Sequence, residues 1–497
     1  MKKSIILLAT AALLSLGSCD LDINDNPNFP SGKTMTRDVM FPAVENAVAA
    51  AVGDQMFNYA GFFAQYFEQR PEANQYNNLA ELQLDESSNL LDRTYSVLYA
   101  GALQDIKEVK TLTTNSHDLF ALAVMRAYIY QLLVDNMDFA PYTEALQSHA
   151  NTRPKWDDGE TIYKGVLAEM DEAQANIVIE KDSMFTDPML HKDVNQWIGF
   201  ANALRLRMYL RLIDGGIDAD AYTAKVKALV ENGAFFTGDV AWDVYSNADG
   251  QYNPWYAAYK ELGTINHVAA HPIVSYYLQT GDPRISYAIK QNSKEKYVGQ
   301  IPGAKTTMEA WTGKPWKNAN VSAIDYTAAT AMPVYLYTQS ELQFLIAEVK
   351  LRFCGDDGGA KMAYENGVRA DFASRRVQGV ETFLEGAAVN WDLQADNTAK
   401  LNLIYMQKWA ALFFRDHMEA WTEVRRTDVP QLSTATAQEV YKNPQSYVAG
   451  NMINPAVNHI VGGGLCKRVP YPALARQLNR NTPPAKLLSD RVFWDAK

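Results

Sequence analysis

Cysteine is scarce in this chain of 497 residues, which has three, at Cys19, Cys354 and Cys466. Their separations match no zinc motif, and three cysteines are too few for a disulfide scaffold. The sequence leaves open whether Cys354 and Cys466 pair or stay as thiols. Catalytic signatures are missing as well: there is no Gly-x-Ser-x-Gly elbow, and the glycine run 462–464 lacks the lysine and hydroxyl of a phosphate-binding loop. We therefore expect a protein that is not an enzyme, with no metal site and no cofactor.

Long apolar runs are confined to the N-terminus. After Met1-Lys2-Lys3, residues 5–16 are almost entirely apolar, which is too short for a permanent transmembrane helix and typical of a secretory signal. The run ends in Leu16-Gly17-Ser18-Cys19, and a small residue directly before a cysteine is where bacterial lipoproteins are cleaved and acylated. The sequence thus predicts a lipoprotein signal peptide over residues 1–18 and a lipid anchor on Cys19.

Positive charge is in deficit. The formal net charge is −11, and cleavage after residue 18 removes Lys2 and Lys3, which leaves −13. Residues 19–35 open with an acidic, turn-prone stretch and are predicted to form an extended acidic tether. An acidic protein gains no electrostatic attraction to nucleic acid or to an anionic bilayer surface. We therefore expect no nucleic-acid partner, and membrane contact through the lipid anchor only.

Helical periodicity dominates residues 36–497, which we expect to form a single domain. Apolar residues recur at helical spacing in the segments 119–134, 162–173, 197–213, 342–349 and 401–415. Ser340 is the predicted cap of the fourth helix and Gly355 its stop, and we interpret Asp356-Asp357-Gly358 as belonging to the same stop. Because no comparable set of alternating strands is present, the predicted fold is mostly α with little sheet.

Residues 233–333 have a different composition. This segment is rich in glycine and proline, as loops are, but it also contains many aromatic residues. The aromatics are Trp242, Tyr245, Tyr252, Trp255, Tyr256, Tyr259, Tyr276, Tyr277, Trp311 and Trp316. A flexible linker has no use for such side chains, which must either pack or bind something.

Several ordered blocks point to a known family. They are Arg126-Ala127-Tyr128-Ile129-Tyr130, the run 197–207 (WIGFANALRLR), Pro333-Val334 with 341–348 (ELQFLIAE), Gln407-Lys408-Trp409 with Glu419-Ala420-Trp421, and Arg468-Val469-Pro470-Tyr471-Pro472. Together with the lipoprotein signal, these blocks resemble the SusD/RagB family of nutrient-binding outer-membrane lipoproteins of the Bacteroidetes, in its SusD-like branch. Within the blocks, we interpret Trp197, Phe200, Phe344 and Trp409 as core, and Asn202, Arg205 and Arg207 as holding buried turns and carboxylates.

The resemblance implies a scaffold of four helix pairs of the tetratricopeptide type, in the N-terminal half and around residues 333–369. It also implies that the loop-rich insert at about 233–333 supplies much of the ligand surface. In this family the lipoprotein sits at the outer membrane as a lid on a SusC-like TonB-dependent barrel and passes a nutrient into it. We accordingly expect lipid anchoring in the outer membrane, facing the cell exterior.

The expected ligand chemistry selects candidate site residues. Aromatic faces suit the apolar side of a sugar ring, and neighbouring polar groups suit its hydroxyls. The candidates are Tyr66, Arg70, Tyr76, Asn77, Trp242, Trp255, Tyr256, Trp311 and Trp316. For each aromatic taken singly, packing in the interior is the competing interpretation.

The leading hypothesis is a surface lipoprotein that binds a glycan and delivers it to the transporter. Within the same family, an oligopeptide or amino-acid ligand is an alternative. A surface glycoside hydrolase is another, and it requires two carboxyl groups facing each other across a groove. The last alternative is a purely structural partner of the barrel, with no ligand of its own. The sequence does not identify the ligand.

Overall fold

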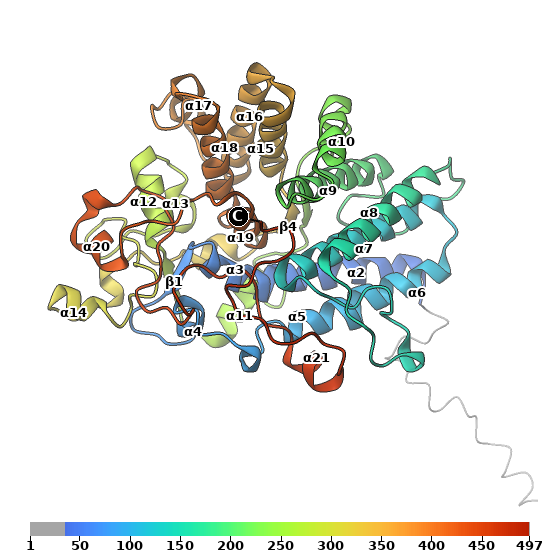
Figure 1. Ribbon diagram of the computed structural model, residues 1–497, viewed down its shortest axis with the longest axis horizontal. Coiled ribbons are helices and arrows are strands. Elements are labelled where there is room, and N and C mark those ends of the chain that lie inside the picture. The colour runs from blue at the N-terminus through green and yellow to red at the C-terminus, as the bar shows by residue number, and fades with distance from the viewer. Residues whose placement is uncertain (1–34, 497) are drawn as a thin grey trace, which may run out of the picture.

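The computed structural model of the protein describes residues 35–496 (Figure 1). The predicted signal peptide 1–18, the anchor Cys19 and all but the last residue of the predicted tether lie outside the described residues. In the described part, helices α6, α8 and α10 gather at one end of the molecule, and α12, α14 and α20 lie at the other.

Helices account for most of the regular structure. The α-helices are α2 (Arg37–Ala51), α3 (Phe57–Phe63), α4 (Asn77–Ala80), α5 (Asp92–Ser96), α6 (Gln104–Leu112), α7 (Ser116–Met137), α8 (Gly159–Ala175), α9 (Val194–Asp214), α10 (Ala219–Asn232), α11 (Pro254–Leu262), α12 (His271–Thr280), α13 (Ile285–Ala288), α14 (Met308–Thr312), α15 (Gln339–Val349), α16 (Asp357–Arg375), α17 (Val380–Leu384), α18 (Asn397–Leu412), α19 (His417–Thr427), α20 (Ala437–Lys442) and α21 (Ala473–Leu478). Three π-helical segments, Val52–Met56, Val97–Leu103 and Lys350–Cys354, extend neighbouring helices.

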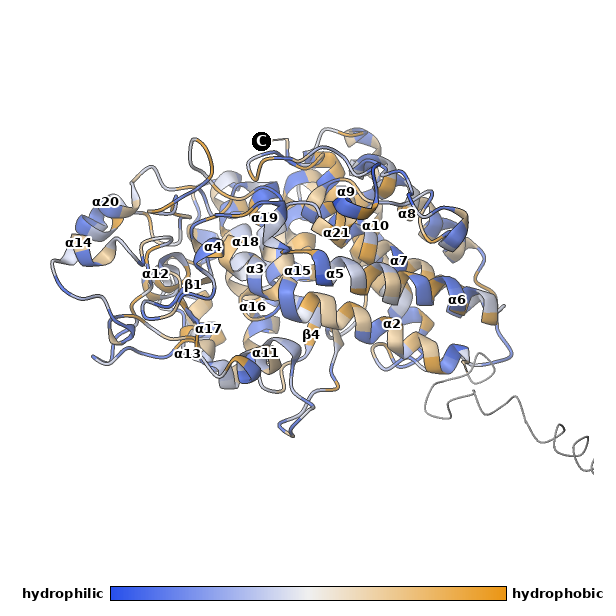
Figure 2. Ribbon diagram, turned by 90° about the horizontal axis from the view of Figure 1, so that it is seen from below, coloured by the Kyte–Doolittle hydropathy of each residue, from blue (hydrophilic) through white to orange (hydrophobic). Residues whose placement is uncertain are grey.

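The long helices form antiparallel pairs. In the first pair, α2 packs against both α6 and the π-helical segment Val97–Leu103 that precedes α6. In the other three pairs, α7 packs against α8, α9 against α10, and α15 against α16. These four pairs occupy the N-terminal half and the segment after residue 333, which confirms the predicted mostly α, tetratricopeptide-like scaffold. Figure 2 shows apolar and polar residues alternating along α2 and α6, as expected where one face of each helix is buried.

Helix ends follow local capping chemistry, with two corrections to the sequence interpretation. Asp158 caps α8, since its side chain accepts from the Thr161 amide at 2.9 Å. The cap of α15 is Thr338 and not Ser340, because the helix begins two residues earlier than expected and Thr338 accepts from the Glu341 amide at 3.1 Å. Asp356 starts α16 instead of ending the preceding helix, because its carboxylate accepts from the Gly359 amide.

Strands are few and short. β1 (Phe67–Gln69) pairs antiparallel with β3 (His267–Ala269), and β2 (Val240–Trp242) pairs antiparallel with β4 (Val334–Tyr337), with an irregularity between Val240 and Ala241. Each pair joins a segment of the insert 233–333 to the scaffold. The β1–β3 ladder fixes the insert beside the end of α3, next to the cavity described below.

The insert 233–333 is more ordered than a set of loops. It contains α11, α12, α13 and α14 as well as β2 and β3. Many of its aromatic side chains pack in the main core, whereas Met308 and its neighbours on α14 form a separate small apolar cluster with Val440 of α20. The two sequence-distant segments α14 and α20 therefore form one end of the molecule (Figure 1).

The scaffold core contains charged groups as well as apolar ones. Arg207 donates to the carboxylate of Glu341 at 2.8 and 2.9 Å, and Arg426 donates to Glu348 at 2.7 and 2.8 Å, with all four side chains buried. Arg205 pairs with Asp171 at 2.9 Å. These contacts agree with the arginine roles predicted from the sequence. Because each of these arginines has a carboxylate partner on another helix, the network fixes how the helices lie against one another.

The predicted core residues are buried, and the two described cysteines are unpaired. Trp197, Phe200, Phe344 and Trp409 are each at most 2% exposed. Cys354 and Cys466 are free thiols within the described residues. The question that the sequence left open is thus answered for this pair.

Candidate functional site

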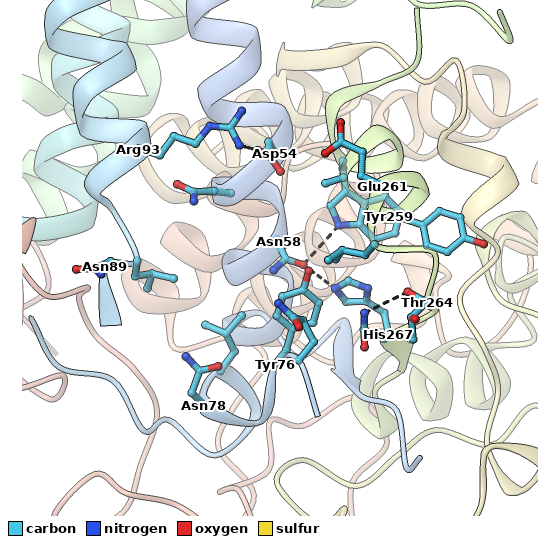
Figure 3. Close-up of a pocket in the computed structure, with 18 of the residues that line it drawn as sticks. Asp54, Asn58, Tyr76, Asn78, Asn89, Arg93, Tyr259, Glu261, Thr264 and His267 are labelled. Carbon is cyan, nitrogen blue, oxygen red and sulfur yellow. Dashed lines mark hydrogen bonds and ion pairs between the residues drawn. The ribbon is translucent and has the colours of Figure 1, made fainter. Parts of the chain in front are cut away.

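A cavity of about 540 Å³ lies where the N-terminal helices meet the insert (Figure 3). One wall comes from residues 54–93 and the other from α11, the start of β3 and Tyr326. The lining residues are Asp54, Gln55, Asn58, Gln75, Tyr76, Asn78, Leu79, Ser88, Asn89, Leu90, Arg93, Trp255, Ala258, Tyr259, Glu261, Leu262, Thr264, Asn266, His267 and Tyr326. This lining combines amide side chains with aromatic rings and contains few aliphatic groups.

The insert side of the cavity is built on a stack of aromatic rings. The ring of Trp255 lies between Phe67 and Tyr326, with centroids 5.5 and 4.7 Å away and interplanar angles of 13° and 4°. Tyr259 stacks on Tyr326 at 4.0 Å. Both faces of Trp255 are therefore covered, and the half-buried Tyr259 is the end of the stack. This packing makes the aromatic wall rigid.

A neutral histidine links the two walls. Burial lowers the pKa of His267 to about 3, so its imidazole is uncharged at neutral pH. Its Nε2 lies 2.6 Å from Asn58 Oδ1, and its Nδ1 contacts the hydroxyl of Tyr326. With the Asn58 carbonyl oxygen as acceptor, Nε2 carries the proton and the Asn58 amide nitrogen remains available as a donor.

Three charged side chains also line the cavity. Arg93 pairs with Asp54 at 3.2 Å, and Glu261 belongs to α11 on the opposite wall. Burial raises the pKa of the Asp54 carboxyl above its usual value, Arg93 opposes this rise, and the nearby carboxylate of Glu261 adds to it. Figure 3 shows Asp54 between Arg93 and Glu261.

Two of the nine candidates from the sequence, Tyr76 and Trp255, line this cavity. Trp255 does not offer an open face, because it is 3% exposed and stacked on both sides. Tyr66 and Trp242 are corrections. Tyr66 is completely buried with its hydroxyl on the Trp409 carbonyl, and Trp242 is 6% exposed within β2. For these two, interior packing is the correct interpretation.

The remaining candidates lie outside the cavity. Arg70 donates to the Ile265 carbonyl at 3.3 Å beside β1, and Asn77 follows Tyr76 in the chain without lining the cavity. Tyr256 is a half-buried residue of α11. Trp311 stacks on Tyr441 of α20, and Trp316 donates from Nε1 to Gln300 at 2.8 Å. The last two are thus part of the α14–α20 end, so the candidates do not form one site.

Several lining residues were not among the candidates. They are Asp54, Gln55, Asn58, Asn89, Arg93, Tyr259, Glu261 and His267. Asn58 carried a usable signal, because it is a polar residue inside the otherwise apolar helix α3 (FNYAGFF). Asp54 and Gln55 precede Asn58 by one helical turn, and Tyr259 and Glu261 share α11, but no spacing in the sequence links these groups with Asn89, Arg93 and His267.

Comparison with known proteins identifies the family. A model of a SusD-like family, described as starch-binding and associating with the outer membrane, matches residues 29–447. The chain belongs to the SusD-like family. The resemblance inferred from the ordered blocks is confirmed. No curated protein matches the sequence.

Solved structures of SusD homologues share the fold. A homologue from Bacteroides uniformis is 20% identical, with a TM-score of 0.70 over 93% of this chain and 100% of the other. One from Bacteroides fragilis is 18% identical, with a TM-score of 0.71 over 93% and 100%. A chitin-binding homologue from Flavobacterium johnsoniae is 19% identical, with a TM-score of 0.70 over 93% and 98%. At these identities the likeness establishes the fold of this SusD-like protein.

Residues 35–496 contain neither a candidate membrane span nor a cluster of metal-binding side chains. No helix in this range has both the length and the apolar character that crossing a membrane requires. Within the same range, no cluster of three or more histidine, cysteine or carboxylate side chains is placed to hold a metal ion.

Proposed function

We propose that this SusD-like protein binds a glycan in the cavity between α3 and α11 and delivers it to a SusC-like TonB-dependent transporter. The observation that carries the proposal is the lining itself, in which half-buried tyrosines stand beside amide side chains that keep unused donors or acceptors. A sugar offers an apolar ring face and a rim of hydroxyls, and this lining complements both.

The cavity also has the size and rigidity that such a site needs. At about 540 Å³ it lies in the usual range for small-molecule pockets. The aromatic stack and the contact between His267 and Asn58 hold its walls in place without a ligand. A preformed site loses less conformational freedom on binding. The chitin-binding homologue is consistent with a glycan ligand for this fold.

The cellular setting is part of the same proposal. Lipidation at Cys19 would hold the protein at the outer membrane, and surface display would place the cavity where polysaccharides are met. Mild detergent solubilisation should recover the protein together with a barrel of the SusC type. Recovery of the lipoprotein alone, under conditions that preserve other such pairs, would contradict the transporter role.

Two matched pairs of variants test the binding site. Tyr259 and Tyr256 are half-buried tyrosines of α11, but only Tyr259 lines the cavity. Asn78 and Asn77 are adjacent half-buried asparagines, and only Asn78 lines it. Tyr259→Ala should weaken glycan binding by about 1–3 kcal/mol, the size of ring stacking on aromatics, and Asn78→Ala by about 1 kcal/mol.

Calorimetric titration with oligosaccharides that bind the wild type measures these effects. Tyr256→Ala and Asn77→Ala are the controls and should bind as the wild type does. Equal affinity in all four variants would show that the glycan binds elsewhere. A wild type that binds peptides and no glycan would favour the oligopeptide alternative.

The hydrolase alternative has one observation in its favour, because Asp54 and Glu261 line the same cavity from opposite walls. Burial raises the pKa of Asp54, but Arg93 opposes this rise and occupies the carboxylate at 3.2 Å. We therefore expect no new reducing ends when the wild type is incubated with a glycan that it binds. Release that disappears in Asp54→Asn would establish hydrolysis instead.

A further inference from the structure

The charges around the cavity are not balanced. Asp54, Arg93 and Glu261 are its three charged lining residues, and His267 is neutral. Arg93 and Asp54 neutralise each other at 3.2 Å. Glu261 is exposed at the end of α11 and forms no ion pair with any described residue. One uncompensated negative charge therefore faces the ligand space.

The single cation in the lining, Arg93, is 73% exposed but already serves as the counter-charge of Asp54. The side chain of Asp54 is 18% exposed and depends on Arg93 for its counter-charge. If a ligand carboxylate drew Arg93 away, Asp54 would be left partly buried beside a second negative group. Like charges in a partly desolvated site repel more strongly than they do in water.

The neutral lining residues, in contrast, have hydrogen-bonding capacity to spare. Gln55 accepts from the Thr94 hydroxyl through Oε1 at 3.1 Å, which leaves its amide nitrogen available. The amide nitrogen of Asn58 is also available, because His267 occupies only the Oδ1 atom of this side chain. Asn78 and Asn89 line the cavity as well. Such amides pair well with hydroxyl and acetamido groups.

From this charge pattern we infer that the cavity accepts uncharged glycans and rejects those with uronate or sulfate groups, with Glu261 as the residue that determines this selectivity. The inference rests on the proposed glycan-binding function. It names the substrate class of the same site.

The test uses one ligand in three forms. The neutral oligosaccharide that binds best is oxidised at C6 to the uronate, and part of the uronate is converted to the uncharged uronamide. The acid and the amide have nearly the same size, so a difference between them reports charge and not shape. All three are titrated against the full-length lipoprotein in detergent.

The wild type should bind the uronate at least about tenfold more weakly than the neutral glycan, because two like charges about 4 Å apart repel by about 1 kcal/mol in bulk water and by more at a protein surface. The uronamide should recover most of that loss. The discrimination between acid and amide should shrink between 20 and 500 mM salt, since screening weakens repulsion at exposed charges.

Glu261→Gln should reduce the discrimination between acid and amide to about threefold or less, with each affinity taken relative to the same variant's affinity for the neutral glycan. Asp243→Asn is the matched control, because Asp243 is an exposed carboxylate of the insert outside the cavity. It removes the same net charge and should leave the discrimination unchanged.

Three results would overturn the inference. The wild type could bind the uronate as tightly as the neutral glycan, the uronamide could bind as weakly as the acid, or Glu261→Gln could discriminate as the wild type does. Each of these leaves glycan binding itself established. Absence of binding to any glycan is a different result, and it would overturn the proposed function together with the selectivity.

Discussion

A buried acid in the scaffold makes a measurable prediction about stability. Glu45 of α2 is completely buried, and neither of its carboxyl oxygens has a hydrogen-bond partner among the described residues. Its charged neighbour is the carboxylate of Asp187, which already accepts from Trp197 Nε1 at 2.7 Å and from the Leu190 amide at 2.9 Å. Burial first, and Asp187 second, raise the pKa of Glu45 from 4.5 to about 11.

The magnitude follows from proton linkage. A raised pKa means that the folded protein keeps a proton that the unfolded chain releases above about pH 4.5, so this contribution to stability is lost as the pH rises. Each pH unit in that window costs about 1.36 kcal/mol, and three units, from pH 4.5 to 7.5, cost about 4 kcal/mol. Glu45→Gln supplies a neutral group of the same shape. It should therefore stabilise the protein by up to about 4 kcal/mol at pH 7.5 and by less than about 1 kcal/mol at pH 5.

Thermal melting at pH 5.0, 6.0 and 7.5 measures the effect. With about 2.1 cal/mol/K of unfolding entropy per residue and about 460 ordered residues, 4 kcal/mol corresponds to a rise in Tm of about 4 °C. The exposed acid Glu385 provides the control, and Glu385→Gln should change Tm by less than 1 °C at every pH. If Glu45→Gln melted at or below the wild-type temperature at pH 7.5, Glu45 would not be a protonated buried acid.

Three other predictions concern the core and the anchor. Trp197→Ala removes a fully buried ring and should lower the free energy of unfolding by about 3–5 kcal/mol. Trp316→Ala removes a half-buried ring and should lower it by less than half as much, and chemical denaturation of both variants measures the difference. Arg426→Met removes the partner that contacts both oxygens of the buried Glu348 carboxylate and leaves only Arg352 and Tyr405 on Oε1, so it should destabilise by about 3–5 kcal/mol in the same assay, and an unchanged midpoint would contradict the role of this ion pair. Cys19→Ala should move the protein from the membrane to the soluble fraction, and retention after a high-salt wash would contradict lipid anchoring.

The scaffold was largely predictable from the sequence, because the helical spacing of apolar residues is visible in one sequence. The segments 119–134, 162–173 and 197–213 fall within α7, α8 and α9. Helix ends were harder to predict. Thr338 and Ser340 are both reasonable caps, and the choice depends on where the chain leaves β4. That turn is a tertiary feature, so propensity alone does not determine it.

The site was much less predictable, because aromatic side chains serve two purposes in the insert. Trp255 and Tyr259 belong to the same helix, yet one is enclosed by Phe67 and Tyr326 while the other ends the stack. The residue types and their spacing in the sequence do not show which of the two rings is enclosed and which ends the stack. The ring that the helix turns toward the scaffold is covered, and only the packed structure shows which one it is. Asn58 was overlooked because its role depends on His267, which is 209 residues away in the chain.

The two walls of the cavity differ in how freely they can change. Asn58 is part of α3, which packs against α19 in the main core, so a substitution there disturbs the scaffold as well as the site. Glu261 is exposed at the end of α11 and does not belong to the main core. A change at Glu261 can therefore alter the charge presented to the ligand at little cost in stability, whereas a change at Asn58 also releases His267 from its contact. Under the proposed function, the scaffold wall would set the hydrogen bonds that a ligand makes, and the insert wall would be where ligand preference can shift while the fold stays the same.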